Sequence, residues 1–129
     1  MRVEKYIDRV SGKELRKEIH YFNGHYWHNK CAEYYYLDNN MHKEDGPAWI
    51  SYLENGNLSG EYYKINGDEW YRENSPYRIS YHKDGSKEKF YRINGIEKIE
   101  KIEKVENEKT LKRKGFIESK TRRIFILEE

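Results

Sequence analysis

Three side chains of the kinds that bind transition metals follow one another in the segment HYWHNKC. His25, His28 and Cys31 stand at successive intervals of three residues. Zinc sites use these ligand types, but on an extended strand a spacing of three sends neighbouring side chains to opposite faces, so they could converge only from a turn. The alternative is that they continue an aromatic, half-exposed strand after the turn at Asn23-Gly24. We favour this alternative and expect no metal or other cofactor.

The same segment and the turn HKEDG contain Cys, His, Glu and Asp, the residue types that hydrolases use for catalysis. Their pattern, however, does not match a catalytic site. Cys31 has His28 nearby in sequence, yet a nucleophile also needs an orienting third group and oxyanion donors, which the pattern does not supply. Glu44 and Asp45 form a carboxylate pair, but the aspartate precedes Gly-Pro, where it would hydrogen-bond the turn backbone. His42 is expected to pack or to cap the same turn. We therefore predict that the protein is not an enzyme.

Short strands between glycine- and asparagine-rich turns must position these residues. Dipeptides such as Asn-Gly and Asp-Gly accept the positive φ of tight hairpin turns. The turn dipeptides are Ser11-Gly12, Asn23-Gly24, Asn39-Asn40, Asn55-Gly56, Asn66-Gly67, Asp84-Gly85 and Asn94-Gly95. The runs between them are rich in Tyr, Ile, Trp and Phe, and they predict strands at 18–22, 32–37, 48–53, 61–65, 77–82 and 89–93. The fold class that follows is mainly β, an elongated meander of antiparallel β-hairpins.

The turns recur periodically, which indicates an internal repeat. WISYLENG, which starts at Trp49, aligns with RISYHKDG, which starts at Arg78, at an offset of 29 residues. YKING aligns with YRING at an offset of 28. The connecting segment HKEDGPA has its counterpart in YRENSPY, where Tyr71 takes the place of His42.

The signature HxEDGPA, followed by xIxYxxNG and YYxxNG, resembles the MORN-like repeats of bacterial, phage and large-virus proteins, including repeat-type antitoxins. The strong match covers residues 42–95, with a degenerate extension back to about residue 7. The resemblance implies successive β-hairpins stacked into an elongated, twisted sheet, and it brings no catalytic motif. The second copy departs from the pattern, because Ser75 and Tyr77 replace the Gly and Ala of GPA.

The chain after residue 95 has no repeat character. Within a single domain, 1–129, we assign 7–95 to hairpin repeats, 96–115 to a charged helical segment and 116–129 to a terminal strand or hairpin. Glu/Lys pairs four residues apart favour the helix, as do apolar residues at Ile96, Ile99, Ile102 and Val105. A charged edge strand is the competing interpretation, because a spacing of three drifts around a helix.

Composition favours an ordered, soluble protein. The chain has 13 Tyr, 3 Trp and 4 Phe, and such side chains can build a thin core that needs few aliphatic residues. A formal net charge of +2 is too near neutral to indicate a nucleic-acid binder by itself. The opening MRVEKYIDRV lacks the apolar core of a signal peptide, and one cysteine excludes an internal disulfide. We expect a cytoplasmic protein of a bacterial cell or a phage-infected host.

The strongest functional signal is a basic strip near the C-terminus. Against the single Glu118, residues 109–123 carry Lys109, Lys112, Arg113, Lys114, Lys120, Arg122 and Arg123. Such a strip could contact nucleic-acid phosphates or an acidic protein face. A second candidate is Trp70-Tyr71-Arg72, an aromatic and cationic segment that could stack bases. The alternative for both is a solvated charged segment beside a sheet whose tyrosines build the core.

These observations predict a non-enzymatic binding module for a protein or nucleoprotein target. One version, which rests on the resemblance, is a small phage- or antitoxin-like inhibitor that blocks a bacterial nuclease or a CRISPR-like defence complex. The alternatives are direct RNA or DNA binding through the basic strip and a membrane-surface scaffold, and the lack of an amphipathic basic helix argues against the scaffold. The edge strands of an open meander could also pair two copies into a homodimer.

Overall fold

The protein folds as one long antiparallel meander. The computed structural model describes residues 1–25, 28–104 and 121–128, with backbone alone from residue 104 onward. The strands are β1 (Arg2–Ile7), β2 (Glu14–Tyr21), β3 (Lys30–Leu37), β4 (Asn40–Met41), β5 (Trp49–Tyr52), β6 (Leu58–Tyr62), β7 (Lys64–Ile65), β8 (Asp68–Glu69), β9 (Arg78–Tyr81), β10 (Lys87–Ile93), β11 (Ile96–Lys104) and β12 (Thr121–Glu128). A single 3-10 turn, η1 (Phe22–Gly24), is the only helical element of the described residues.

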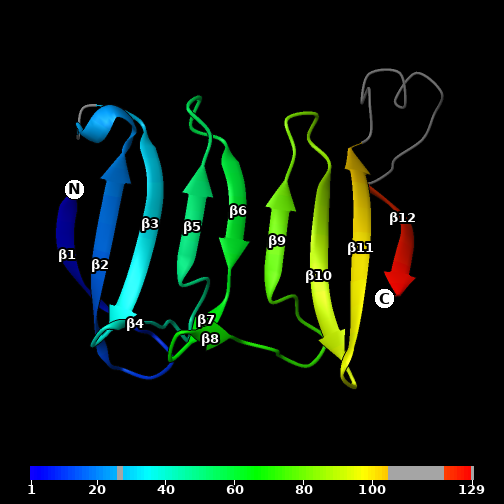
Figure 1. The fold of residues 1–129 in the computed structure, drawn as a ribbon, viewed down its shortest axis with the longest axis horizontal. Helices are drawn as coiled ribbons and strands as arrows, with labels where there is room; N and C mark the ends of the chain where they lie inside the picture. The colour runs from blue at the N-terminus through cyan, green and yellow to red at the C-terminus, as the bar shows by residue number, and fades with distance from the viewer. Residues whose placement is uncertain (26–27, 105–120, 129) are drawn as a thin grey trace.

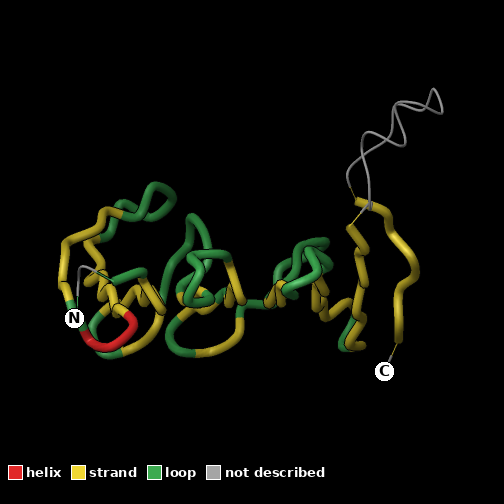
Figure 2. Tube along the Cα trace, turned by 90° about the horizontal axis from the view of Figure 1, so that it is seen from above, coloured by secondary structure: helices red, strands yellow, loops and turns green. Residues whose placement is uncertain are grey.

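The large sheet follows chain order. Its strands run β1-β2-β3-β5-β6-β9-β10-β11-β12, with β4 paired to β3, and β7 and β8 form a separate two-stranded ribbon. Figure 1 shows the strands side by side along the longest axis of the molecule, and Figure 2 shows that they form one layer. Among the described residues, no helix is long and apolar enough to cross a membrane.

The structure confirms the mainly β prediction and corrects one segment. The helix predicted for 96–115 is wrong where the structure describes it, because residues 96–104 form β11 between β10 and β12. Pairing on both sides satisfies the backbone groups of β11, whereas a triplet spacing gives a helix only an apolar stripe that drifts around its axis. The rest of that segment, 105–115, lies outside the described residues. The terminal strand is confirmed as β12, and residues 116–120 also lie outside the described part.

The repeat is visible in the backbone. Asp38, Asn66 and Asn94, each 28 residues from the next, all have a left-handed φ of 50° to 56°. The hairpins that follow them place β4, β8 and the start of β11 at the same spacing. Short asparagine and aspartate side chains tolerate this conformation, so the repeated residue type follows from the repeated turn.

Equivalent hydrogen bonds refine the alignment of the connecting segments. The His42 amide donates to the Tyr35 carbonyl (2.9 Å), and the Trp70 amide donates to the Tyr63 carbonyl (3.0 Å). Tyr35 and Tyr63 occupy equivalent positions, so Trp70, and not Tyr71, takes the place of His42. The second connecting segment is therefore one residue longer than the first.

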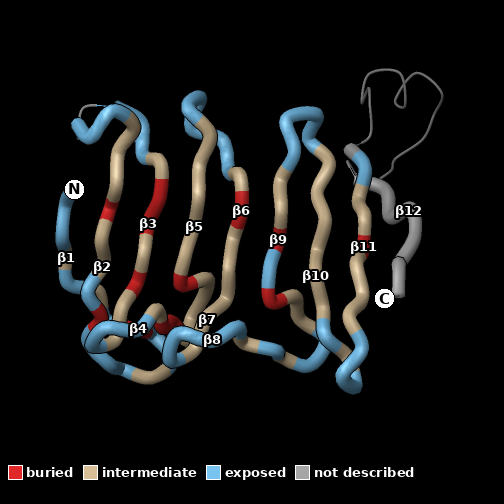
Figure 3. Tube along the Cα trace, viewed as in Figure 1, coloured by how far each residue is buried: buried red, intermediate tan, exposed pale blue. Residues whose placement is uncertain are grey.

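The core is thin, because one layer of strands has nothing packed over most of its surface. Figure 3 shows few buried positions, and the other positions are intermediate or exposed. The buried apolar residues are Leu15, Ile19, Ala32, Tyr35, Ala48, Tyr77 and Ile79. Both faces of the sheet thus present half-exposed side chains, and aromatic contacts supply much of the packing that a second layer would give.

Candidate functional site

One row of large side chains crosses the middle of the sheet on a single face. Directly opposite residues of antiparallel strands share a face. The register pairs Tyr34 with Trp49, Trp49 with Tyr62, Tyr62 with Arg78, and Arg78 with Phe90. We call these five residues the aromatic ladder and their side of the sheet the ladder face. The ladder runs from β3 to β10 without a gap.

The rings of the ladder stand against one another across the strands. Trp49 and Tyr62 are stacked with centroids 4.1 Å apart and planes 21° apart, and Tyr34 stacks on Trp49 at 5.7 Å and 22°. The indole is therefore covered on both of its faces, by a neighbour on β3 and a neighbour on β6. The indole Nε1 is buried as well, and it has no hydrogen-bond partner among the described residues.

Arg78 interrupts the row of rings and is exposed. Its guanidinium carbon lies 5.6 Å from the centroid of Tyr62 and 4.8 Å from that of Phe90. Cation–π contacts on both sides hold the guanidinium in place. Among the residues that the structure describes, no carboxylate forms an ion pair with it.

Over β1 and β2 the ladder face carries charges of both signs. Lys5 on β1 lies directly opposite Arg16 on β2, and Arg16 lies opposite Tyr36 on β3. The Arg16 guanidinium carbon is 4.7 Å from the Tyr36 ring centroid, and its Nε donates to Glu18 at 3.0 Å. A groove of about 490 Å³ runs along these residues, and Glu4, Glu14 and Asp38 line it as well. Within the described part of the chain Lys5 forms no ion pair.

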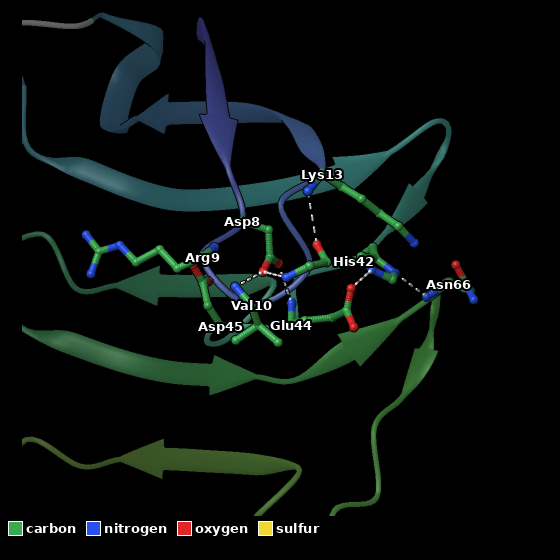
Figure 4. Close-up of polar contacts among 9 residues, drawn as sticks. Asp8, Arg9, Val10, Lys13, His42, Glu44, Asp45 and Asn66 are labelled. Atoms are coloured by element: carbon green, nitrogen blue, oxygen red, sulfur yellow. Dashed lines mark hydrogen bonds and ion pairs between the residues drawn. The ribbon is translucent and has the colours of Figure 1, made fainter.

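The opposite face holds a buried polar cluster at the corner between the β1–β2 turn and residues 42–46 (Figure 4). Asp8 is fully buried, and its Oδ1 accepts hydrogen bonds from the amides of Val10 (2.8 Å) and Ser11 (3.0 Å). Its Oδ2 accepts the amide of Glu44 at 2.6 Å. Burial raises the pKa of Asp8, but these backbone donors outweigh it and hold the pKa below 3.8.

Asp45 fixes the other half of this corner. Its Oδ2 accepts the Tyr6 hydroxyl and the Arg9 amide (2.9 Å), and its Oδ1 lies 3.4 Å from the ammonium of Lys43 in an ion pair without hydrogen-bond geometry. The Lys43 ammonium also lies 4.2 Å from the ring centroid of Tyr35. Asp45 thus accepts a backbone amide, as the sequence predicted, but the amide is that of Arg9 in the β1–β2 turn and not one of its own turn.

His42 is buried and its two ring nitrogens are both engaged. Nδ1 accepts the Asn66 amide at 3.2 Å, and Nε2 lies 3.3 Å from a carboxylate oxygen of Glu44. An accepting Nδ1 assigns the proton to Nε2, which donates to Glu44. The prediction that His42 packs or caps its turn is confirmed.

In the structure, Tyr71 and Arg72 of the predicted segment Trp70-Tyr71-Arg72 contact other residues of the protein. The Arg72 guanidinium lies 3.9 Å from the ring centroid of Tyr63 and donates to the Pro76 carbonyl at 2.7 Å. Tyr71 is exposed, and its hydroxyl donates to Glu69 at 2.6 Å. Arg72 therefore holds its own loop and offers no free stacking face.

The basic strip lies almost wholly beyond what the structure describes. Lys109, Lys112, Arg113, Lys114 and Lys120 fall outside the described residues. Arg122 and Arg123 lie on β12, opposite Glu103 and Ile102 in the register with β11. The prediction that the strip binds nucleic acid stays a prediction.

The histidine and cysteine segment does not form a metal site in the described part of the chain. The rings of His25 and His28 are 6.0 Å apart, and Cys31 lies at the start of β3. No three His, Cys, Asp or Glu side chains of the described residues are placed to hold a metal ion.

Comparison of the chain with protein-family models, curated proteins and solved structures finds no match. The resemblance to MORN-like repeats therefore stays a prediction from the quoted motifs. The aromatic ladder was not identified from the sequence. The repeat alignment of WISY with RISY carried part of the signal, because it places Trp49 and Arg78 at the same position of successive units.

Proposed function

We propose that this protein is a non-enzymatic binding module that holds a protein partner on the ladder face. The observation that carries the proposal is the continuous row of Tyr34, Trp49, Tyr62, Arg78 and Phe90, in which Arg78 is exposed and the four aromatic side chains are half-buried. Tyrosine, tryptophan and arginine are the residues most enriched at interface hot spots. Their mutual stacking holds them rigid before binding, so little side-chain entropy is lost on association.

A protein partner fits the ladder better than a single-stranded nucleic acid. Proteins that bind single strands place bases on the faces of aromatic rings. Here the faces of the Trp49 indole are already occupied by Tyr34 and Tyr62. Ring edges and hydroxyls instead suit the backbone groups and side chains of a protein surface.

The inhibitor version of this proposal rests on the resemblance alone. Under it, the partner is a bacterial nuclease or a nucleoprotein defence complex. The basic strip supports nucleic-acid binding as the competing function, because residues 109–123 contain seven Lys or Arg and a single Glu.

A pull-down from bacterial lysate with the immobilised protein, with and without nuclease, tests the proposal. We expect a retained protein band that survives nuclease and moderate salt and that is lost in Phe90→Ala. Lys89→Ala changes the preceding residue on the other face of β10 and serves as the control. Retention that disappears with nuclease, or a band that Phe90→Ala retains in full, contradicts the proposal.

A further inference from the structure

Asn-Gly dipeptides are chemically reactive as well as turn-forming. The backbone nitrogen of the glycine can attack the side-chain carbonyl carbon of the asparagine, and a glycine leaves this approach open because it has no side chain. The chain has four such dipeptides, Asn23-Gly24, Asn55-Gly56, Asn66-Gly67 and Asn94-Gly95. All of these residues are exposed, so access to solvent does not distinguish the four sites.

Hydrogen bonding of the glycine amide does distinguish them. Gly24 lies within the 3-10 turn η1, and the Gly56 amide donates to a carbonyl of its own turn at 2.9 Å. The Gly67 amide donates to the Met41 carbonyl at 2.8 Å. The Gly95 amide has no acceptor among the described residues. An amide that donates a hydrogen bond must open before its nitrogen can attack, whereas the Gly95 amide needs no such opening.

The turns at Asn66-Gly67 and Asn94-Gly95 are otherwise alike. Both follow the sequence Tyr-x-Ile, and φ is 50° and 87° in the first turn against 53° and 76° in the second. The first turn is docked against the preceding repeat. The Asn66 amide donates to Nδ1 of His42 at 3.2 Å, and Oδ1 of Asn40 lies 3.3 Å from the point at which a β-carbon on Gly67 would stand. Around the corresponding point on Gly95, no heavy atom beyond its chain neighbours lies within 4 Å, and the β10–β11 turn projects from the end of the sheet (Figure 1).

We propose that Asn94 is a site of spontaneous modification, at which water converts the side-chain amide to an acid with loss of ammonia. The Gly95 nitrogen gives up its proton to solvent and bonds to the side-chain carbonyl carbon of Asn94. The bond from that carbon to Nδ2 breaks, and ammonia leaves with a proton from solvent. Water, the only co-reactant, then opens the resulting cyclic imide. Opening at the side-chain carbonyl gives aspartate, and opening at the main-chain carbonyl gives isoaspartate.

Isoaspartate at position 94 changes the β10–β11 hairpin. Its main chain runs through the former side chain, which adds an atom to the loop between Ile93 and Ile96, the pair at the turn end of the β10–β11 register. Loop length sets the register of a hairpin, so the longer loop disturbs this pairing. Both products also place a new carboxylate near Arg92, whose guanidinium donates to the Gly95 carbonyl at 3.3 Å. Conversion to isoaspartate therefore weakens the hairpin, and this effect does not depend on the ladder face or its partner.

Ageing of the full-length protein at mildly alkaline pH, in buffer and in denaturing urea, tests the proposal. Cleavage after Lys and Arg releases the two matched sites in separate peptides, 65–72 and 93–98, and chromatography with mass spectrometry measures the acid products in each. In buffer we expect Asn94 to convert roughly tenfold or more faster than Asn66, because the hydrogen bonds of the Asn66 and Gly67 amides must open first. In urea the two rates should become equal, because the local sequences match. A sample digested at the start sets the background.

Asn94→Gly is the control variant, because glycine accepts the positive φ of the turn and has no side-chain amide to lose. During ageing in buffer the urea midpoint of the wild-type chain should fall, and that of Asn94→Gly should stay constant. Comparable conversion of Asn94 and Asn66 in buffer, or a rate ratio that persists in urea, overturns the proposal. An unchanged midpoint in a wild-type chain that has converted to isoaspartate overturns the effect on the hairpin.

Discussion

The phenol oxygen of Tyr62 lies 2.9 Å from the point at which a β-carbon on Gly60 would stand, and two ring carbons lie 3.0 and 3.1 Å from that point. Gly60 is buried in the middle of β6, two residues before Tyr62 on the same face. The ring thus leans along its own strand over a residue without a side chain. Glycine weakens a strand interior, and here the close approach of the ring accounts for its presence.

Gly60→Ala is expected to displace the Tyr62 ring and to destabilise the sheet by about 1–3 kcal/mol, the usual cost of overpacking. Urea denaturation measures the loss. Ser80→Ala is the control, because Ser80 lies directly opposite Gly60 on β9 and the change removes only a hydroxyl. Adding Tyr62→Ser to Gly60→Ala should then cost less than adding it to the wild-type chain. Equal costs in the two backgrounds contradict the contact.

Asp8→Ala is expected to destabilise the protein on the order of 3 kcal/mol, because each buried donor left unpaired costs about 1–3 kcal/mol. The change removes the hydrogen-bond acceptor of three backbone amides at the corner, those of Val10, Ser11 and Glu44. Asp84→Ala is the matched control: Asp84 accepts the Ser86 amide in the exposed β9–β10 turn, where water can replace it. A loss in Asp8→Ala no larger than in the control shows that the corner does not hold β1 in place.

The hairpins were predictable from sequence because their determinants are local. A left-handed φ at Asn66 or Asn94 favours a short polar side chain whatever surrounds it, and the following glycine fits the same turn. Alternating aromatic residues between such turns then predict strands without knowledge of the rest of the fold.

The parts that escaped prediction depend on residues far apart in the chain. The strand β1 was not predicted, because RVEKYI is short and charged, and Tyr6 is fixed by Asp45 from a distant turn. The segment 96–104 reads as a helix until β10 and β12 are placed on either side. Arg78 becomes part of a ladder only through the register of β9 with β6 and β10.

Stability should fall in acid through the corner cluster. The pKa of Asp8 and that of Asp45 are both lowered from 3.8, because hydrogen-bond donors at each carboxylate outweigh the effect of burial. The folded chain therefore binds these protons less readily than the unfolded chain. The stabilisation is complete when the pH is above 3.8, the ordinary pKa of an aspartate, and it is lost as the pH falls through the lower pKa values of the folded chain.

Urea midpoints measured from neutral pH into the acid range check this expectation. Asp8→Asn should show a shallower decline than the wild-type chain, because its side chain does not titrate there. Parallel declines in the two proteins contradict the assignment of Asp8 to the acid transition.

Stability should also fall in strong alkali, with the opposite sign of linkage. Burial, followed by the hydrogen bond to Asp45, raises the pKa of Tyr6 from 10.0 to about 12, and burial next to Glu33 raises the pKa of Tyr35 to about 12. Both phenols hold their protons more tightly in the folded chain, so their contribution is complete below pH 10 and is lost as the pH rises toward about 12. Tyr6→Phe removes one titrating group, and Asp45→Asn removes the carboxylate that accepts the Tyr6 hydroxyl. In both variants the urea midpoint of unfolding should fall less steeply with rising pH than in the wild-type chain. Equal slopes in wild-type protein and Tyr6→Phe would show that the folded chain does not hold the Tyr6 proton.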